Sequence, residues 1–132
     1  MTRATVIADG LYFGEGPRWH DGRLWFSDFY DHAVKSMDPA GSVRTELEID
    51  DQPSGLGWLP DGRLLVVSMR DHRILRRSPD GEVSLHADIS EHCGGHLNDM
   101  VVDAQGRAWV GNFGFDLMGG CSPATANLIR VD

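Results

Sequence analysis

Apolar residues gather in short runs along this sequence, and most of the 16 glycines fall just before or inside those runs. This pattern is typical of all-β folds with many tight turns. The runs either alternate with polar positions or are apolar throughout, which predicts half-buried or fully buried strands at residues 23–27, 63–68 and 107–111. A turn glycine precedes each run, and these glycines, Gly22, Gly62 and Gly106, are 40 and 44 residues apart.

The pattern repeats beyond the turn glycines. Three segments align when they are started at Glu15, Ser54 and Asn98. In the first two segments a second turn with proline in its second place, DPAG at 38–41 and SPDG at 78–81, leads into a further strand, predicted at 42–48 and 82–87. Four short antiparallel strands in about 40 residues correspond to one blade of a β-propeller.

We therefore predict a partial propeller of the six-bladed type, with all 132 residues in one domain and blades at roughly 12–50, 51–92 and 93–132. Residues 3–8 are predicted to be a strand that would close the last blade of the ring. Half of a propeller suggests a truncated chain, a split protein, or a half that pairs either with a copy of itself or with a missing C-terminal half. The alternative fold is a β-sandwich whose turn spacing is coincidental.

Composition narrows the classes of partner. The net charge of −8 and the pI near 5.0 argue against nucleic acid and against an anionic membrane surface. No apolar run is long enough to span a bilayer, and the N-terminus is not a convincing signal peptide. Cys93 and Cys121 lie in unlike contexts, so we expect free thiols and a cytoplasmic location.

The repeat gives Glu15 a structural context. Trp19, Trp58 and Val102 hold equivalent places in the first strand of each blade, and four positions before them lie Glu15, Ser54 and Asn98. Equivalent positions of successive blades converge at one mouth of the central channel. Their oxygen atoms suit a hard cation such as Ca²⁺, with Zn²⁺, Mg²⁺ and Mn²⁺ as alternatives, whereas a tetrahedral nitrogen and sulfur site for zinc is disfavoured.

The motifs GEGPRW, PSGLGW-PDGRL and NDMVVDAQGRAWVGNFGFD resemble the SMP-30/gluconolactonase/LRE-like family along the whole chain. The resemblance implies a six-bladed propeller of about twice this length, with one divalent metal in its channel and, in many members, lactone hydrolysis. By position, Glu15 would ligate the metal, and Asn98 would contact metal or substrate. Asp116 would contact substrate. His96 departs from the family pattern, which has an arginine at this place, and its own position near the channel mouth predicts a hydrogen bond to substrate. Further ligands and the general base would lie beyond Asp132.

One loop and several histidines and arginines outside these positions are further candidates for binding. The long loop at 114–127 is predicted to form a lid or specificity wall. His92, Cys93 and His96 are not expected to bind metal, because Gly94 and Gly95 prevent a stable helix. The arginines at 70, 73, 76 and 77 are interpreted as a solvated charged face, and His20, His32, His72 and His86 as solvated.

The predicted function is metal-dependent hydrolysis of a lactone of a sugar acid or a related small molecule, which would be the substrate and partner. One alternative is a hydrolase of organophosphates or other esters on the same scaffold, since substrate choice depends on loops. Another is a non-catalytic metal-binding propeller fragment.

Overall fold

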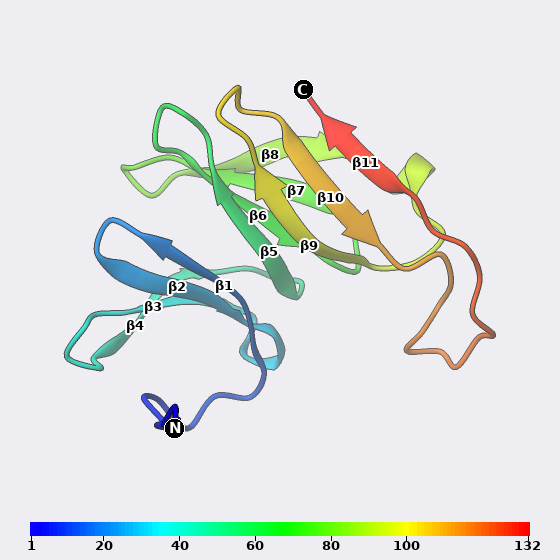
Figure 1. The fold of residues 1–132 in the computed structure, drawn as a ribbon. Helices are drawn as coiled ribbons and strands as arrows, with labels where there is room; N and C mark the ends of the chain where they lie inside the picture. The colour runs from blue at the N-terminus through cyan, green and yellow to red at the C-terminus, as the bar shows by residue number, and fades with distance from the viewer.

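The computed structural model describes residues 1–132 and consists of three antiparallel β-sheets that fan out side by side (Figure 1). The first sheet contains β1 (Gly14–His20), β2 (Arg23–Asp28), β3 (Ala33–Met37) and β4 (Val43–Glu48). The second contains β5 (Pro53–Trp58), β6 (Leu64–Ser68), β7 (Arg73–Arg77) and β8 (Val83–Asp88). The third contains β9 (Leu97–Val102), β10 (Ala108–Asn112) and β11 (Leu128–Val131). Two single-turn 3₁₀ helices, η1 (Phe29–Asp31) and η2 (Ser90–His92), lie in the connections.

The predicted all-β partial propeller is confirmed, and each sheet lies within one of the three predicted ranges. Two details differ from the expectation. The third sheet has three strands in this chain rather than four. Residues 3–8 form no strand, because a strand needs a partner edge and the blade that this segment was expected to complete is not part of the chain. Ile7 and Leu11 instead line a groove over Leu24 and Met37 on the open side of the first sheet.

Strand β6 is fully buried and almost entirely apolar, because both of its faces pack in the core. Leu64 and Val66 point into the cluster shared with the first sheet, which also contains Trp25. Leu65 and Val67 point into the larger cluster shared with the third sheet. Because successive side chains of a strand face opposite sides, a strand between two blades is apolar at every position. The two inter-blade clusters are the core of the molecule.

The turns follow the repeat. Asp21 and Gly22 form the hairpin between β1 and β2 with φ values of 47° and 74°, the left-handed pair that a two-residue hairpin requires. His32 and His72 hold equivalent left-handed positions, at φ 55° and 57°, just before the third strand of their blades. His32 Nδ1 lies 2.9 Å from the carbonyl oxygen of Asp51.

The innermost strands β1, β5 and β9 run side by side, as Figure 1 shows. A glycine in β5 makes their close approach possible. A Cβ atom on Gly55 would lie 2.3 Å from the backbone nitrogen of Met100, closer than any side chain could fit. Gly55 therefore sets the spacing between the second and third blades.

The far ends of the first two blades are held by aromatic packing. The rings of His20 and Trp58 stack at 3.9 Å between centroids, and Trp25 packs edge-on against Trp58. His20 is therefore a packing residue and not a solvated one. His86 is also partly buried, and that burial, together with Arg76 and Arg63, lowers its pKa. The prediction that these two histidines are solvated was wrong.

Candidate metal and substrate site

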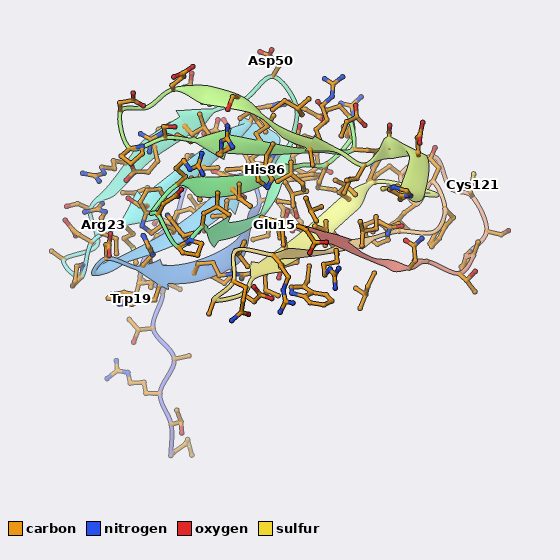
Figure 2. The ribbon with its side chains drawn as sticks, turned by 90° about the horizontal axis from the view of Figure 1, so that it is seen from above. Glu15, Trp19, Arg23, Asp50, His86 and Cys121 are labelled. Atoms are coloured by element: carbon orange, nitrogen blue, oxygen red, sulfur yellow. The ribbon has the colours of Figure 1, made fainter.

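Glu15 is half-buried near the start of β1 and lies toward the middle of the molecule in the view of Figure 2. The backbone of the next residue, Gly16, passes close to Ser54, since a Cβ there would be 3.1 Å from the Ser54 carbonyl oxygen. Burial raises the pKa of the Glu15 carboxyl, a hydrogen bond from the Ser54 side chain lowers it, and the charge of Asp99 raises it further, so that the net shift is upward. The predicted convergence of Glu15 and Ser54 is thus found in the structure.

The third sheet contributes a carboxylate, Asp99 of β9, which sequence reasoning missed. It follows the predicted Asn98 directly, and its charge is felt at Glu15. Arg18 of β1 donates to Asp99 Oδ1 at 2.6 Å and to the Met100 carbonyl at 2.7 Å. Asn98 is half-buried at the start of β9 and makes no hydrogen bond through its side chain. Its role toward metal or substrate stays a prediction.

A cation fits the Glu15 carboxylate. Its Oε1 atom is buried and accepts no hydrogen bond. A desolvated carboxylate oxygen without a donor is costly, and oxygen ligands of this kind are what Ca²⁺ binds. No three side chains among His, Cys, Asp and Glu gather into a metal-binding group in this chain. Glu15 would therefore be one ligand of a shell that needs oxygen atoms from elsewhere.

A second feature is a cavity of about 390 Å³ at the loop end of the blades. All three blades contribute to its wall: Phe29 and Tyr30 come from η1, Gln52 precedes β5, Arg70 follows β6, His96 precedes β9, and Asp116, Met118 and Gly119 belong to the β10–β11 loop. Of the predicted substrate residues, His96 and Asp116 thus meet at one cavity. Asn98 does not line it, and Glu15 opens instead onto the groove beneath Ile7.

The loop at 114–127 forms one side of this cavity, as the prediction of a wall requires. Asp116 is fixed by its own loop, because Gly119 N donates to its Oδ1 at 2.8 Å. The loop packs against the Gly94–Gly95 pair, where a Cβ on Gly95 would lie 2.1 Å from the carbonyl oxygen of Phe115. These glycines permit close backbone packing beside the cavity.

The interpretation of Arg70 as part of a solvated face was incomplete. Its side chain is 58% exposed, yet it lines the same cavity as the β10–β11 loop. His72 was also expected to be solvated, but its Nε2 atom is buried without a partner, and its ring lies 6.3 Å from that of His96. No local signal in the sequence separates Arg70 from its arginine neighbours, because the cavity forms only when the blades pack.

The two cysteines are free thiols. Cys93 Sγ donates to the Ile89 carbonyl at 3.1 Å, and burial together with the charge of Asp88 raises its pKa. Cys121 is exposed on the β10–β11 loop, at the outer edge of the molecule in Figure 2. The chain forms no helix of the length and apolarity that crossing a membrane requires.

Comparison with solved structures places the fold. A gluconolactonase from Xanthomonas campestris superposes with a TM-score of 0.78 at 22% identity, over 96% of this chain and 46% of that one. Regucalcin from Agrobacterium tumefaciens, described as a calcium-binding protein, gives 0.66 at 23% identity over 80% and 37%. A luciferin-regenerating enzyme gives 0.62 at 22% identity over 76% and 36%. The chain spans less than half the length of each of these propellers.

The sequence itself matches one family over nearly its whole length. Residues 13–132 fit the description SMP-30/gluconolactonase/LRE-like region, which includes β1 with Glu15, the channel strands β5 and β9, and the long β10–β11 loop. The repeat, the blade geometry and this match agree, so the chain belongs to the SMP-30/gluconolactonase/LRE-like family.

Proposed function

We propose that this chain is part of a metal-dependent hydrolase that opens a lactone of a sugar acid or a related small molecule. The observation that carries the proposal is the half-buried Glu15 carboxylate, whose Oε1 atom is buried and lacks any hydrogen-bond donor. Family membership supports the lactone as the class of substrate. Because the chain spans less than half of its structural neighbours, the activity belongs to an assembly larger than one such chain.

The residues of the proposed site divide between holding the cation and contacting the substrate. Glu15 would hold the cation, Ca²⁺ being the first candidate, while the nearby Ser54 side chain lowers the pKa of the carboxyl and so favours its charged form. Asn98 would either ligate the cation through its amide oxygen or orient the substrate carbonyl. His96 and Asp116 would contact the substrate in the cavity that they line. The general base and the remaining ligands would come from blades outside this chain.

The reaction is a hydrolysis in which water adds to the ring carbonyl carbon and the ring carbon–oxygen bond breaks. The departing oxygen takes up a proton, and the product is an open-chain hydroxy acid. When bound, the cation would stabilise the negative charge that develops on the carbonyl oxygen. The residues of this chain position that oxygen and the hydroxyl groups of the substrate. The free thiols are compatible with the cytoplasmic location that we propose.

Calorimetric titration of the chain with CaCl₂ tests the metal role. Because the chain supplies only part of the ligand shell, we expect weak binding at a single site. Glu15→Gln should weaken it at least about tenfold further, because the substitution removes a full negative charge from a hard-cation site. Glu48→Gln is the matched control, since Glu48 is an exposed glutamate on the outer strand β4, and it should leave the affinity unchanged. Equal affinity of wild type and Glu15→Gln would refute the role of Glu15.

The hydrolase role is tested with panels of lactones and organophosphate esters in the presence of Ca²⁺, Zn²⁺, Mg²⁺ or Mn²⁺. The assay is run at protein concentrations where sedimentation has established the assembly state. Lactone turnover that is lost in Glu15→Gln supports the proposal. Turnover of organophosphates alone would favour the other hydrolase, and tight calcium binding without any turnover would favour a non-catalytic binding propeller.

A further inference from the structure

The cavity at the loop end of the blades has an uneven distribution of charge. Among the side chains that line it, Arg70 is the one with a permanent positive charge, and Asp116 is the carboxylate. Phe29, Tyr30 and Met118 give it apolar surface. At about 390 Å³ it has the size of sites that take small organic molecules.

The backbone of Arg70 is fixed by hydrogen bonds, whereas its guanidinium is held only by a long ion pair with Asp51. Asp51 Oδ2 accepts hydrogen bonds from the backbone nitrogens of Arg70 and Asp71, at 2.7 and 2.8 Å, which anchors the β6–β7 loop. The Arg70 side chain makes no hydrogen bond, and its Nε lies 3.9 Å from Asp51 Oδ1. A guanidinium in this state offers its planar set of N–H donors to an incoming anion.

Asp116, which lines the same cavity, has one oxygen already engaged by Gly119 N. Its carboxylate accepts hydrogen bonds and repels negative charge, so it suits hydroxyl groups of a ligand. Near this carboxylate a singly charged anion is less penalised than a doubly charged phosphate. Arg70 therefore favours a single carboxylate on the ligand, and Asp116 favours hydroxyl groups elsewhere on the same molecule.

We propose that Arg70 is the anion-binding residue of this cavity and that the substrate is a lactone carrying a second, free carboxylate. The carboxylate pairs with the Arg70 guanidinium beside the Tyr30 ring, and the hydroxyl groups of the ligand face Asp116. This inference rests on the proposed lactonase function for the reaction, although the binding of the carboxylate is measured separately from turnover.

Two matched lactones test the inference. The γ-lactone of glucaric acid and the γ-lactone of gluconic acid differ only in that a terminal carboxylate replaces a hydroxymethyl group. We expect the glucaric lactone to bind the chain about 10- to 100-fold more tightly in calorimetric titration, the range for a hydrogen bond to a charged group. Gluconolactone phosphorylated on that hydroxymethyl group is the third probe.

Variants identify the residue responsible. Arg70→Gln should remove the preference for the glucaric lactone and leave binding of the gluconic lactone within about twofold, whereas Arg70→Lys should retain part of it because charge remains without the planar fork. Arg44→Gln is the control, since Arg44 is 60% exposed and lies on β4, away from the cavity. Thermal melts of all variants monitor folding.

The outcomes separate the inference from the proposed function. A preference for the glucaric lactone that depends on Arg70 supports the inference, and the absence of turnover in an assembly that supplies the remaining blades refutes the lactonase. Turnover of both lactones at equal KM, unchanged in Arg70→Gln, refutes the inference and leaves the lactonase standing. Tighter binding of the phosphorylated lactone, or no binding of the glucaric lactone at millimolar concentration, also refutes it.

Discussion

Arg18 of β1 donates to Asp99 of β9 at 2.6 Å, so the first blade is tied directly to the third across the strand that separates them. The same guanidinium donates to the Met100 carbonyl at 2.7 Å. Arg18 can reach across β5 because Gly55 lies beside Met100, where any side chain on β5 would collide with the Met100 backbone. Arg18 therefore links the first and third blades, whose strands are not hydrogen-bonded to one another.

A double-mutant cycle measures this tie. Arg18→Gln should lower the free energy of unfolding by about 1–2 kcal/mol, because it removes both the ion pair and the hydrogen bond to Met100. The coupling energy between Arg18→Gln and Asp99→Asn should be about 0.5–1 kcal/mol, since the Asp99 side chain is 57% exposed. Urea unfolding provides the values, and Arg44→Gln, whose partner Glu46 lies on the same strand, should change them by about 0.5 kcal/mol or less. Additive effects would show that the pair contributes nothing.

The buried pair of Asp28 and Lys35 should make stability depend on pH. Burial alone would raise the pKa of Asp28, but Lys35 and the backbone nitrogens of Phe13 and Tyr12 outweigh it and hold the pKa below 3.8. The pKa of Lys35 stands above 10.5, because its hydrogen bonds to Asp28 and Asp31 outweigh its burial. The pair thus stabilises fully between these values and loses its contribution as pH falls below 3.8 or rises above 10.5.

Lys35→Met tests that dependence. At pH 7 it should cost about 3–5 kcal/mol, the range for removing one partner of a buried ion pair. The difference from wild type should stay constant from about pH 5 to pH 9 and shrink as pH falls through the lowered pKa of Asp28. Asp31→Asn, at an aspartate whose side chain is 40% exposed, should cost less than about 1 kcal/mol. A difference that does not vary with pH would contradict the assignment.

Glu15 is expected to serve binding at the expense of stability. Its pKa is raised above 4.5 in the folded chain, so the ionised carboxylate is disfavoured at pH 7. Without metal, Glu15→Gln should therefore unfold at an equal or higher urea concentration than wild type at pH 7. The gain should vanish below pH 4.5, where the carboxyl is protonated in both folded and unfolded states. A marked loss of stability in chelator would indicate a structural role for the carboxylate.

The outer faces of the first and third blades should drive association. Trp19 is 65% exposed and lines a groove with Ile7 on the first blade, and Figure 2 shows it at the margin of the molecule. Val101 and Leu128 are exposed on the third blade. We propose that a second copy or a missing C-terminal half covers these faces, because apolar patches of this kind seek cover. Sedimentation velocity should show self-association of the wild type that Trp19→Glu weakens at least about tenfold.

Leu85→Glu is the control for this experiment. Leu85 is 54% exposed on β8, the outermost strand of the middle blade, and its substitution should not alter association. A wild-type chain that sediments as a monomer at high concentration, with its strand content intact, would exclude pairing with a copy.

The sequence predicted what depends on local chemistry and on the repeat. Asp21 and Gly22 specify a hairpin by themselves, and counting from Trp19 and Trp58 was enough to bring Glu15 to Ser54. Arg70 and Asp99 could not be found in this way. Their importance comes from residues of other blades, and nothing next to them in the chain records that packing.

Residues 3–8 were predicted to be a strand from their own sequence, but they form none in this chain. Their apolar alternation predicted a strand correctly as a propensity, but a strand is completed by hydrogen bonds to a neighbour. In this chain Ile7 and Leu11 line a groove together with Leu24 and Met37 instead. Propensity therefore misleads where the partner edge is not supplied by the same chain.

Lys35 is the only lysine in the sequence, and both of its carboxylate partners hold it in the first blade. Reagents that acylate primary amines should consequently modify the native protein at its N-terminal amine, and reach the lysine when the sheet opens. A chain attached to a surface through amine chemistry would then be oriented by its first residue, and the second acylation would report the unfolding rate directly.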